Sequence, residues 1–299
     1  MTFPFHSFDA TQAFGSALGR FIWPVLTSRR RLVSQGLARH MGYDSITARH
    51  AGMQSFMHTG RSFAELLLTR TIDHRFVHHR VSSNDFQLFI DMLHHDRPVV
   101  ATTAHLGSWE LLSGLLSLYN SKKQALIVVR HPKNRLLAAL MSHFRRHHNV
   151  DVAHKDKAAP KILLGLQKNG VPAFLVDHNT GRSKAMFMPF LNDIAAVNMG
   201  PALLALRAKA LVWPIFLVRN GPGHFFLSVD EPLDTLDLIG STEDKIKSIA
   251  VFYTHKVQEM VERFPEQWFW MHNRWKNRPK GSPVIDPHEF QISEQHSIK

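Results

Sequence analysis

Short apolar runs alternate along this chain with longer amphipathic segments, and this alternation constrains the fold more than any other feature. The apolar runs have the length of buried strands, and the segments between them carry apolar residues at spacings of three and four, which is typical of helices. We expect strands at residues 98–104, 125–130, 171–177, 211–218 and 225–229, and helices at 45–70, 84–95, 111–116, 134–147, 157–168, 201–208 and 241–264. This order predicts a single α/β domain with a mixed, largely parallel sheet flanked by helices.

Composition narrows the class of protein. The chain has 299 residues, 44% of them hydrophobic, so it can bury a substantial core. Its 36 Lys and Arg outnumber 24 Asp and Glu, and the resulting net charge of +12 favours polyanions such as nucleic acid, anionic lipid headgroups or an acidic carrier protein. Cysteine is absent, which excludes a disulfide framework, a thiol nucleophile and a Cys-ligated metal.

The N-terminal segment is both apolar and basic. Between residues 3 and 26 apolar side chains recur at spacings of three and four, and three arginines follow Ser28. This pattern describes an amphipathic helix with a basic end, which either lies in a membrane interface with Trp23 at headgroup depth or packs on the protein's own core. No stretch reaches the roughly 18 apolar residues of a membrane span, and the first nine residues do not resemble a signal peptide.

One hexapeptide, His105-Leu106-Gly107-Ser108-Trp109-Glu110, joins the strand at 98–104 to the helix at 111–116. Ligands and chemistry in open α/β sheets collect at the carboxyl ends of strands, where this imidazole is expected. Four residues separate His105 from Glu110, so the carboxylate can meet one ring nitrogen while the other accepts a proton from a hydroxyl. The alternative is a partly buried His and a charge that the first helical turn stabilises.

Three of the expected strands end on a charged or polar residue: His105, Arg130 and Asp177. Strands of one sheet deliver their carboxyl ends to one edge, so these side chains are expected to converge. Arg130 would then hold a phosphate or stabilise negative charge, and Asp177 would position a loop or an acceptor group. For each residue alone there is an alternative interpretation. Arg130 would form a salt bridge at the end of its strand, and Asp177 would be a turn residue.

Five blocks of the sequence, in order, resemble those of the bacterial lipid A biosynthesis acyltransferases, lauroyl and myristoyl transferases of the lysophospholipid acyltransferase superfamily. His105 to Glu110 resembles the H-x4-D/E block of that family, and residues 130–134 resemble its Arg-Pro-x-x-Asn block. Residues 177–190 are similar to its Asp-x-x-x-Gly and Val-Pro-Phe block, 200–207 to its Gly-Pro-Ala helix, and 265–276 to its closing Pro-Glu-Gln segment. The resemblance covers about residues 28–279.

This resemblance implies a glycerol-phosphate-acyltransferase-like fold and acyl transfer from acyl carrier protein or acyl-coenzyme A to a hydroxyl of a membrane glycolipid, first of all a lipid A precursor. It implies no metal or organic cofactor, because a thioester is already activated. His105 is then the general base and Glu110 its partner. Further catalytic residues are Arg130 and Asp177, and substrate-binding residues are Gly107, Ser108, Asn134 and Arg207.

The same resemblance suggests where the protein works. We expect residues 1–40 to be a membrane-associating segment, 41–280 the catalytic domain and 281–299 a polar tail. Family members usually begin with a longer apolar helix, and residues 3–31 do not form one of that length. We therefore expect surface attachment through residues 3–31, at the cytoplasmic face of the bacterial inner membrane, instead of a span. His131 before Pro132, and His178-Asn179 in place of more acidic residues, leave a phospholipid, another glycolipid or an aminoacyl lipid as alternative acceptors.

Two other classes of protein compete with an acyltransferase. Two sets of histidines have helical spacings suited to a metal ion, and they comprise His74, His78 and His79, and His143, His147 and His148. No carboxylate block accompanies them. A non-catalytic binder of membranes or nucleic acid would also use the positive charge, but Lys and Arg are dispersed and no segment resembles a nucleic-acid module, so no nucleic-acid partner is expected.

Overall fold

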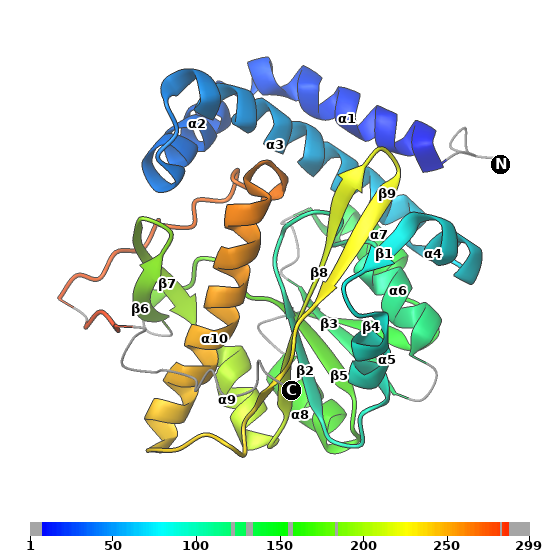
Figure 1. Ribbon diagram of the computed structural model, residues 1–299, viewed down its shortest axis with the longest axis vertical. Coiled ribbons are helices and arrows are strands. Elements are labelled where there is room, and N and C mark those ends of the chain that lie inside the picture. The colour runs from blue at the N-terminus through cyan, green and yellow to red at the C-terminus, as the bar shows by residue number, and fades with distance from the viewer. Residues whose placement is uncertain are drawn as a thin grey trace.

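The computed structural model describes residues 8–120, 123–129, 134–154, 158–182, 185–281 and 283–286. Its centre is a sheet with the strand order β1-β9-β8-β2-β5-β3-β4, in which β10 also pairs with β8 (Figure 1). The strands are β1 (Val81–Ser83), β2 (Val99–Thr103), β3 (Ala125–Val129), β4 (Val150–His154), β5 (Val171–Leu175), β8 (Leu211–Gly221), β9 (His224–Val229) and β10 (Leu233–Asp234). A separate hairpin consists of β6 (Ala185–Phe190) and β7 (Asp193–Asn198).

Most neighbouring strands of this sheet are parallel. Strand β2 is parallel to β5 and β8, and β3 is parallel to β4 and β5, while β9 and β10 are antiparallel to β8. All five residues of β2 are buried, as expected for a strand covered on both faces. The predicted single α/β domain with a mixed, largely parallel sheet is therefore confirmed.

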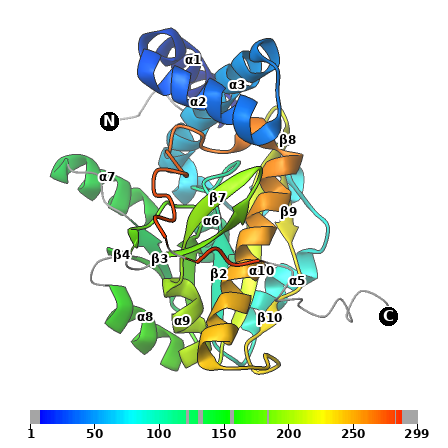
Figure 2. The same ribbon diagram turned by 90° about the vertical axis from the view of Figure 1, so that its left-hand side faces the viewer.

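Helices cover both faces of the sheet and also cap its upper end. They are α1 (Phe8–Val25), α2 (Thr27–Met41), α3 (Ser45–Glu65), α4 (His74–Arg80), α5 (Phe86–His94), α6 (Leu112–Tyr119), α7 (Arg135–Arg145), α8 (Ala158–Gln167), α9 (Gly200–Arg207) and α10 (Thr242–Arg263), with the 3-10 turns η1 (Leu66–Thr71) and η4 (Pro265–Gln267). Neighbouring residues of β2 point to opposite cores: Ala101 packs with α5 and α6, and Val100 with α8, α9 and α10. Figure 2 shows α1, α2 and α3 lying together above the sheet.

The main strands and helices predicted from periodicity are present, and the structure adds several that were not predicted. The unpredicted elements are β1, β4, β10, the β6–β7 hairpin, α2, α4 and η4. Except for the apolar β6, they are short or polar, so their apolar periodicity is weak. Segment 45–70, predicted as one helix, divides into α3 and η1.

Helix α1 packs on α3 through its small residues and turns its large apolar residues outward. A Cβ on Gly19 would overlap the carbonyl of Phe56, and one on Gly60 would overlap the carbonyl of Gly15, so the two backbones approach as closely as glycine allows. Its exposed apolar side chains are Phe14, Leu18, Phe21 and Val25. The amphipathic helix expected here therefore has an apolar face whose large side chains are 42 to 71% exposed.

Trp23 does not belong to that exposed face. Its side chain is only 6% exposed and packs edge-to-face on Phe56, with 4.9 Å between the rings. The expectation that Trp23 lies at headgroup depth is therefore wrong, because the indole is a core residue between α1 and α3. Within the described residues, none of the helices is both long and apolar enough to span a membrane.

The start of the predicted polar tail is attached to the domain. The backbone N–H of Ile285 donates to the carbonyl of Phe187 in β6, 2.8 Å away. Residues 287–299 lie outside the described ranges, so the remainder of the predicted tail stays a prediction.

Candidate active site

Strands β2 and β5 are paired in parallel, and their register brings two of the predicted site residues together. Thr103 is opposite Leu175 at the last pair of this ladder, and His105 and Asp177 each follow two residues later. Nδ1 of His105 lies 2.9 Å from Oδ1 of Asp177, and the backbone N–H of His105 donates to Oδ2 over 2.9 Å. The predicted convergence of these two strand ends is therefore confirmed.

The environment of Asp177 keeps its carboxylate charged. Burial alone would raise the pKa of Asp177. The neighbouring His105 and a hydrogen bond from the indole N–H of Trp268 outweigh burial and hold that pKa well below its usual range. The indole donates to Oδ2 over 2.9 Å. A carboxylate can only accept, so Nδ1 of His105 carries the proton. When the ring is neutral, its Nε2 carries the lone pair that a general base requires.

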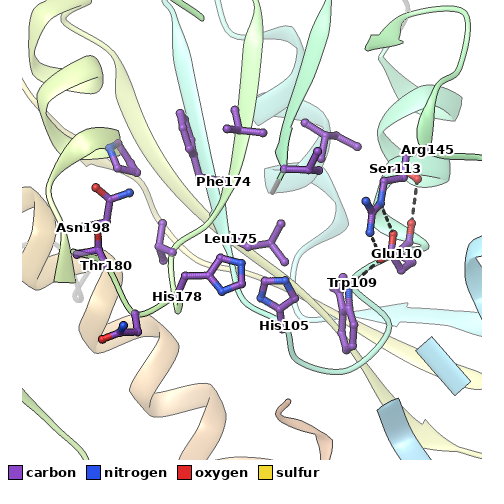
Figure 3. Close-up of a pocket in the computed structure, with 16 residues that line it drawn as sticks. His105, Trp109, Glu110, Ser113, Arg145, Phe174, Leu175, His178, Thr180 and Asn198 are labelled. Atoms are coloured by element: carbon purple, nitrogen blue, oxygen red, sulfur yellow. Dashed lines mark hydrogen bonds and ion pairs between the residues drawn. The ribbon is translucent and has the colours of Figure 1, made fainter. Parts of the chain in front are cut away.

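A pocket opens beside this imidazole, at the carboxyl ends of β2, β3 and β5. Figure 3 shows His105 and His178 side by side in it, with Trp109, Glu110 and Arg145 beyond His105. The ring centres of His105 and His178 are 4.3 Å apart. Burial, and then the electrostatic effect of the neighbouring His105 ring, lower the pKa of His178 to about 3, so the ring of His178 is neutral near pH 7.

Glu110 lines the same pocket, but its carboxylate faces a different partner from the predicted one. Oε2 of Glu110 accepts from Nε of Arg145 over 2.8 Å, and Oε1 accepts from the indole N–H of Trp109 over 3.1 Å. The expectation that Glu110 meets a ring nitrogen of His105 is corrected by this geometry: Asp177 occupies Nδ1. Glu110 lies in the turns that follow β2, next to α7, and the guanidinium of Arg145 in α7 balances its charge. A catalytic role for Glu110 stays a prediction.

Gly107 and Ser108 build the loop between His105 and Glu110. Gly107 has φ = +61°, and a Cβ there would overlap the carbonyl oxygen of Leu217, so this position requires glycine. Ser108 is fully buried, and its hydroxyl donates to Oε1 of Glu65 over 3.2 Å. The hydroxyl of Ser108 is thus bound to α3, and its predicted contact with substrate stays a prediction.

A buried ion pair is linked to this loop by hydrogen bonds through Ser62. Nη2 of Arg219 in β8 lies 2.7 Å from Oε1 of Glu65 in α3, and the same guanidinium donates to the hydroxyl of Ser62 over 2.9 Å. The Ser62 hydroxyl in turn donates to the carbonyl of Gly107 over 2.7 Å. Gln12 of α1 also donates to Glu65, so α1, α3, β8 and the loop share one polar network.

The other predicted residues have different positions. Arg130 lies outside the described residues, so its catalytic role stays a prediction. Asn134 caps α7, because its Oδ1 accepts from the backbone N–H of Leu137 over 3.0 Å. Arg207 is exposed in the last turn of α9, whereas the pocket lies at the first turn of that helix, at Pro201. Substrate contacts of Asn134 and Arg207 remain predictions.

His105, Asp177 and His178 also have ligand atoms within 4.8 Å of one another, a spacing that a metal ion could bridge. Both oxygens of Asp177 already accept from protein donors, which fits a carboxylate that orients an imidazole. Within the described ranges, neither of the two histidine sets considered as an alternative metal site forms such a group. The expectation of no cofactor stays a prediction.

A comparison of the sequence with known protein families gives a match that extends well beyond the residues of this site. Residues 2–277 match the model of the family described as "Bacterial lipid A biosynthesis acyltransferase". The chain belongs to this family.

Curated lipid A acyltransferases are similar to parts of this family member. The chain is 27% identical over 123 residues to the lipid A biosynthesis lauroyltransferase of Escherichia coli (strain K12), a match covering 41% of the chain and 39% of the relative. It is 26% identical over 184 residues to a lipid A biosynthesis acyltransferase of Haemophilus influenzae, covering 60% and 56%. It is 25% identical over 193 residues to the palmitoleoyltransferase of Escherichia coli (strain K12), covering 64% and 60%. The chain thus spans about 40 to 60% of the length of these relatives.

Three side chains of this lipid A acyltransferase family member were missed by sequence reasoning. Arg145 and His178 line the pocket, and Trp268 binds the carboxylate of Asp177. Arg145 stands in the last turn of an amphipathic helix, where a basic residue is ordinary. His178 directly follows Asp177 and Trp268 lies in the closing block, so those two positions carried a usable signal.

Proposed function

We propose that this protein is an O-acyltransferase that moves a fatty acyl chain from a thioester to a hydroxyl of a lipid A precursor. The observation that carries the proposal is the His105–Asp177 pair, which faces a pocket at the strand ends of a chain matched by the lipid A acyltransferase family over residues 2–277. We further propose that acyl carrier protein or coenzyme A carries the acyl chain.

In the proposed reaction, Nε2 of His105 removes the proton of the acceptor hydroxyl while the hydroxyl oxygen attacks the thioester carbonyl. Asp177 holds the imidazole through Nδ1 and stabilises the imidazolium that forms. Collapse of the tetrahedral intermediate breaks the carbon–sulfur bond, and the imidazolium returns its proton to the departing thiolate. One ester and one thiol result, so no oxidant or further reactant is needed.

The acyl chain would lie in a slot beside the pocket, between the sheet and α6. Small side chains provide the space, because Ala101 of β2 and Ala173 of β5 are paired neighbours on that face of the sheet. Leu112 and Leu116 of α6 form the opposite wall. Apolar walls of this kind favour a hydrocarbon chain, and their spacing would limit its length.

The exposed apolar face of α1 would hold the protein at a membrane surface. Phe21 is 71% exposed, and Phe14, Leu18 and Val25 extend the same face. Arg29 and Arg31, exposed near the start of α2, would meet anionic headgroups. We propose peripheral attachment at the cytoplasmic face of the inner membrane, where a thioester donor and a glycolipid acceptor can both reach His105.

Mass spectrometry of lipid A from bacteria that express the protein or its His105→Ala variant tests the proposal. The expected result is a mass increase of one acyl chain that requires His105, and the increase identifies the chain length. An increase on a phospholipid or aminoacyl lipid alone would replace the proposed acceptor. No lipid change, with folded protein at the membrane, would contradict the proposed activity.

A further inference from the structure

His178 lines the pocket beside the proposed base, yet no described residue forms a hydrogen bond with its ring. The ring centres of His178 and His105 are 4.3 Å apart, and Figure 3 shows the His178 ring turned toward His105. Within the described residues its two ring nitrogens have no hydrogen-bond partner, and they do not belong to the fully buried atoms. His178 therefore brings unbonded, accessible nitrogen atoms to the side of the pocket where the proposed reaction takes place.

Hydrogen bonds fix the backbone that carries this ring. The carbonyl of His178 accepts from Nη1 of Arg274 over 3.3 Å, and the N–H of Asn179 donates to Nε2 of His272 over 2.9 Å. The carboxylate of Asp177, the preceding residue, is held by three donors. The ring of His178 is therefore held beside the proposed base before any substrate binds, and such preorganisation is what electrostatic stabilisation of a transition state requires.

Acyl transfer needs a hydrogen-bond donor for the carbonyl oxygen of the thioester. When the acceptor attacks, this oxygen becomes negatively charged, and enzymes place backbone or side-chain N–H groups around it. In the loop after β2, the backbone N–H groups of His105, Gly107 and Ser108 already donate within the protein. These three groups are not available to a substrate, so a side chain that lines the pocket is the stronger candidate.

Three side-chain donors of the pocket are already bonded within the protein. The indole N–H of Trp109 donates to the carboxylate of Glu110 over 3.1 Å, and the hydroxyl of Ser113 donates to the carbonyl of Glu110 over 2.9 Å. Nε and Nη2 of Arg145 both donate to the same carboxylate. Glu110 therefore engages all three of these side chains on one side of the pocket.

The remaining described donors of the pocket lie away from the proposed base or are bonded elsewhere. Figure 3 shows Thr180 and Asn198 beyond His178, on the side away from the base. Oδ1 of Asn179 accepts from the backbone N–H of Asn277 over 3.3 Å, which holds this amide against the C-terminal segment. Among the described residues, His178 is thus the donor next to the base whose ring is free to bind a substrate.

We propose that His178 donates a hydrogen bond from its ring to the carbonyl oxygen of the thioester while His105 takes the proton of the acceptor hydroxyl. This inference rests on the proposed acyl transfer and adds a catalytic residue to it. The ring of His178 is neutral near pH 7, so it has one N–H to donate and no charge that would repel the imidazolium of His105. A neutral imidazole can polarise a carbonyl in this way. No proton leaves His178, and the hydrogen bond weakens again when the carbon–sulfur bond breaks.

Kinetics of two His178 variants test this assignment. His178→Leu removes the donor, and we expect kcat for ester formation from dodecanoyl-coenzyme A and a lipid A precursor to fall about a hundredfold while KM for the donor changes little. His178→Gln keeps an N–H at a similar place and should recover about tenfold of this loss. Wild-type kcat in folded His178→Leu would overturn the proposal. Equal losses in both variants would also overturn it, because the shape of the ring and not its N–H would then matter.

Ser113→Ala is the matched control in the same pocket. It removes a hydroxyl that already donates to a protein carbonyl, so kcat should stay within about threefold of the wild-type value. A loss as large as that in His178→Leu would mean that any polar change in this pocket slows the reaction, and it would contradict a specific hydrogen bond from His178.

A binding measurement separates this inference from the proposed activity. Undecyl trifluoromethyl ketone has the carbon chain of a dodecanoyl group, and its hydrate imitates the tetrahedral intermediate, whereas undecyl methyl ketone stays largely unhydrated. By isothermal titration, the wild-type protein should bind the fluorinated ketone more tightly, and His178→Leu should lose about tenfold of this advantage while His178→Gln retains most of it. That result supports the role of His178 even if no lipid is acylated. An equal advantage in wild type and His178→Leu contradicts it, whether or not acyl transfer occurs.

Discussion

Two buried carboxylates flank the same pocket, and they differ in what they bind. Asp177 contacts an imidazole, a backbone N–H and an indole, whereas Glu110 contacts a guanidinium and an indole. An imidazole can release and accept a proton near neutral pH, and a guanidinium cannot. From this difference we propose that proton transfer takes place on the Asp177 side of the pocket, and that the Glu110 side balances charge between the motif loop and α7.

Replacing Asp177 should have the largest effect of any change in this comparison. Asp177→Asn keeps the size but removes the charge that fixes the Nδ1–H tautomer of His105, so we expect kcat for ester formation to fall about a thousandfold to ten-thousandfold. The measurement is steady-state acyl transfer, with circular dichroism as a control for folding. Full turnover by folded Asp177→Asn would refute its assignment as the partner of His105.

Breaking the Glu110–Arg145 pair should act mainly on stability. Glu110→Ala leaves the buried guanidinium of Arg145 without its counter-charge, and we expect the free energy of unfolding to fall by about 3–5 kcal/mol. Urea denaturation of Glu110→Ala, Arg145→Met and the double variant measures the coupling, and the double variant should recover part of the loss. Unchanged stability with lost turnover would instead give Glu110 the catalytic role that its place in the motif predicts.

The Asp177 side of the pocket should also make the stability of the protein sensitive to acid. Because the folded pKa of His178 is about 3 and its unfolded value about 6.5, the unfolded state binds a proton first as the pH falls. The stability linked to this site is complete above pH 6.5 and is lost progressively toward pH 3, by up to about 1 kcal/mol per pH unit. The lowered pKa of Asp177 acts in the same direction below about pH 4.

His178→Asn isolates this pH effect. Denaturation midpoints measured between pH 7.5 and 4.5 should fall less steeply in His178→Asn than in the wild-type protein. Parallel curves would mean that His178 is protonated in the folded state over this range, in conflict with its burial beside His105.

Ser108 should give the smallest effect. Ser108→Ala removes one hydrogen bond to Glu65, which still accepts from Arg219 and Gln12, so we expect a loss of about 1 kcal/mol and turnover within a few-fold of wild type. Kinetics with varied acceptor concentration check this expectation. A tenfold rise in KM without destabilisation would restore the substrate contact predicted from the motif.

The sequence predicted the sheet well because its strands are buried on both faces and read as apolar runs. It also predicted that His105 and Asp177 converge, since parallel strands bring their carboxyl ends to one edge. It chose the wrong carboxylate for Nδ1 because Glu110 is 5 positions from His105 along the chain, whereas Asp177 is 72 positions away. Chain distance carries no information about the direction in which the loop after β2 turns.

Other parts of the site could not be predicted because tertiary packing decides them. Helix α7 carries its basic residues where many helices do, and only its packing on η1 brings Arg145 to Glu110. Trp23 fitted an interfacial aromatic by sequence, yet the glycine-mediated approach of α1 to α3 buries it. Both outcomes depend on how two helices meet.

Acyl transfer at His105 is tested most directly with purified protein, a dodecanoyl thioester and a lipid A precursor, by counting ester and free thiol together. The expected result is one ester per thiol released by the wild-type protein, and at least about a thousandfold slower formation of both by folded His105→Ala. Thiol release without ester, or equal ester formation by His105→Ala, would contradict acyl transfer by this histidine.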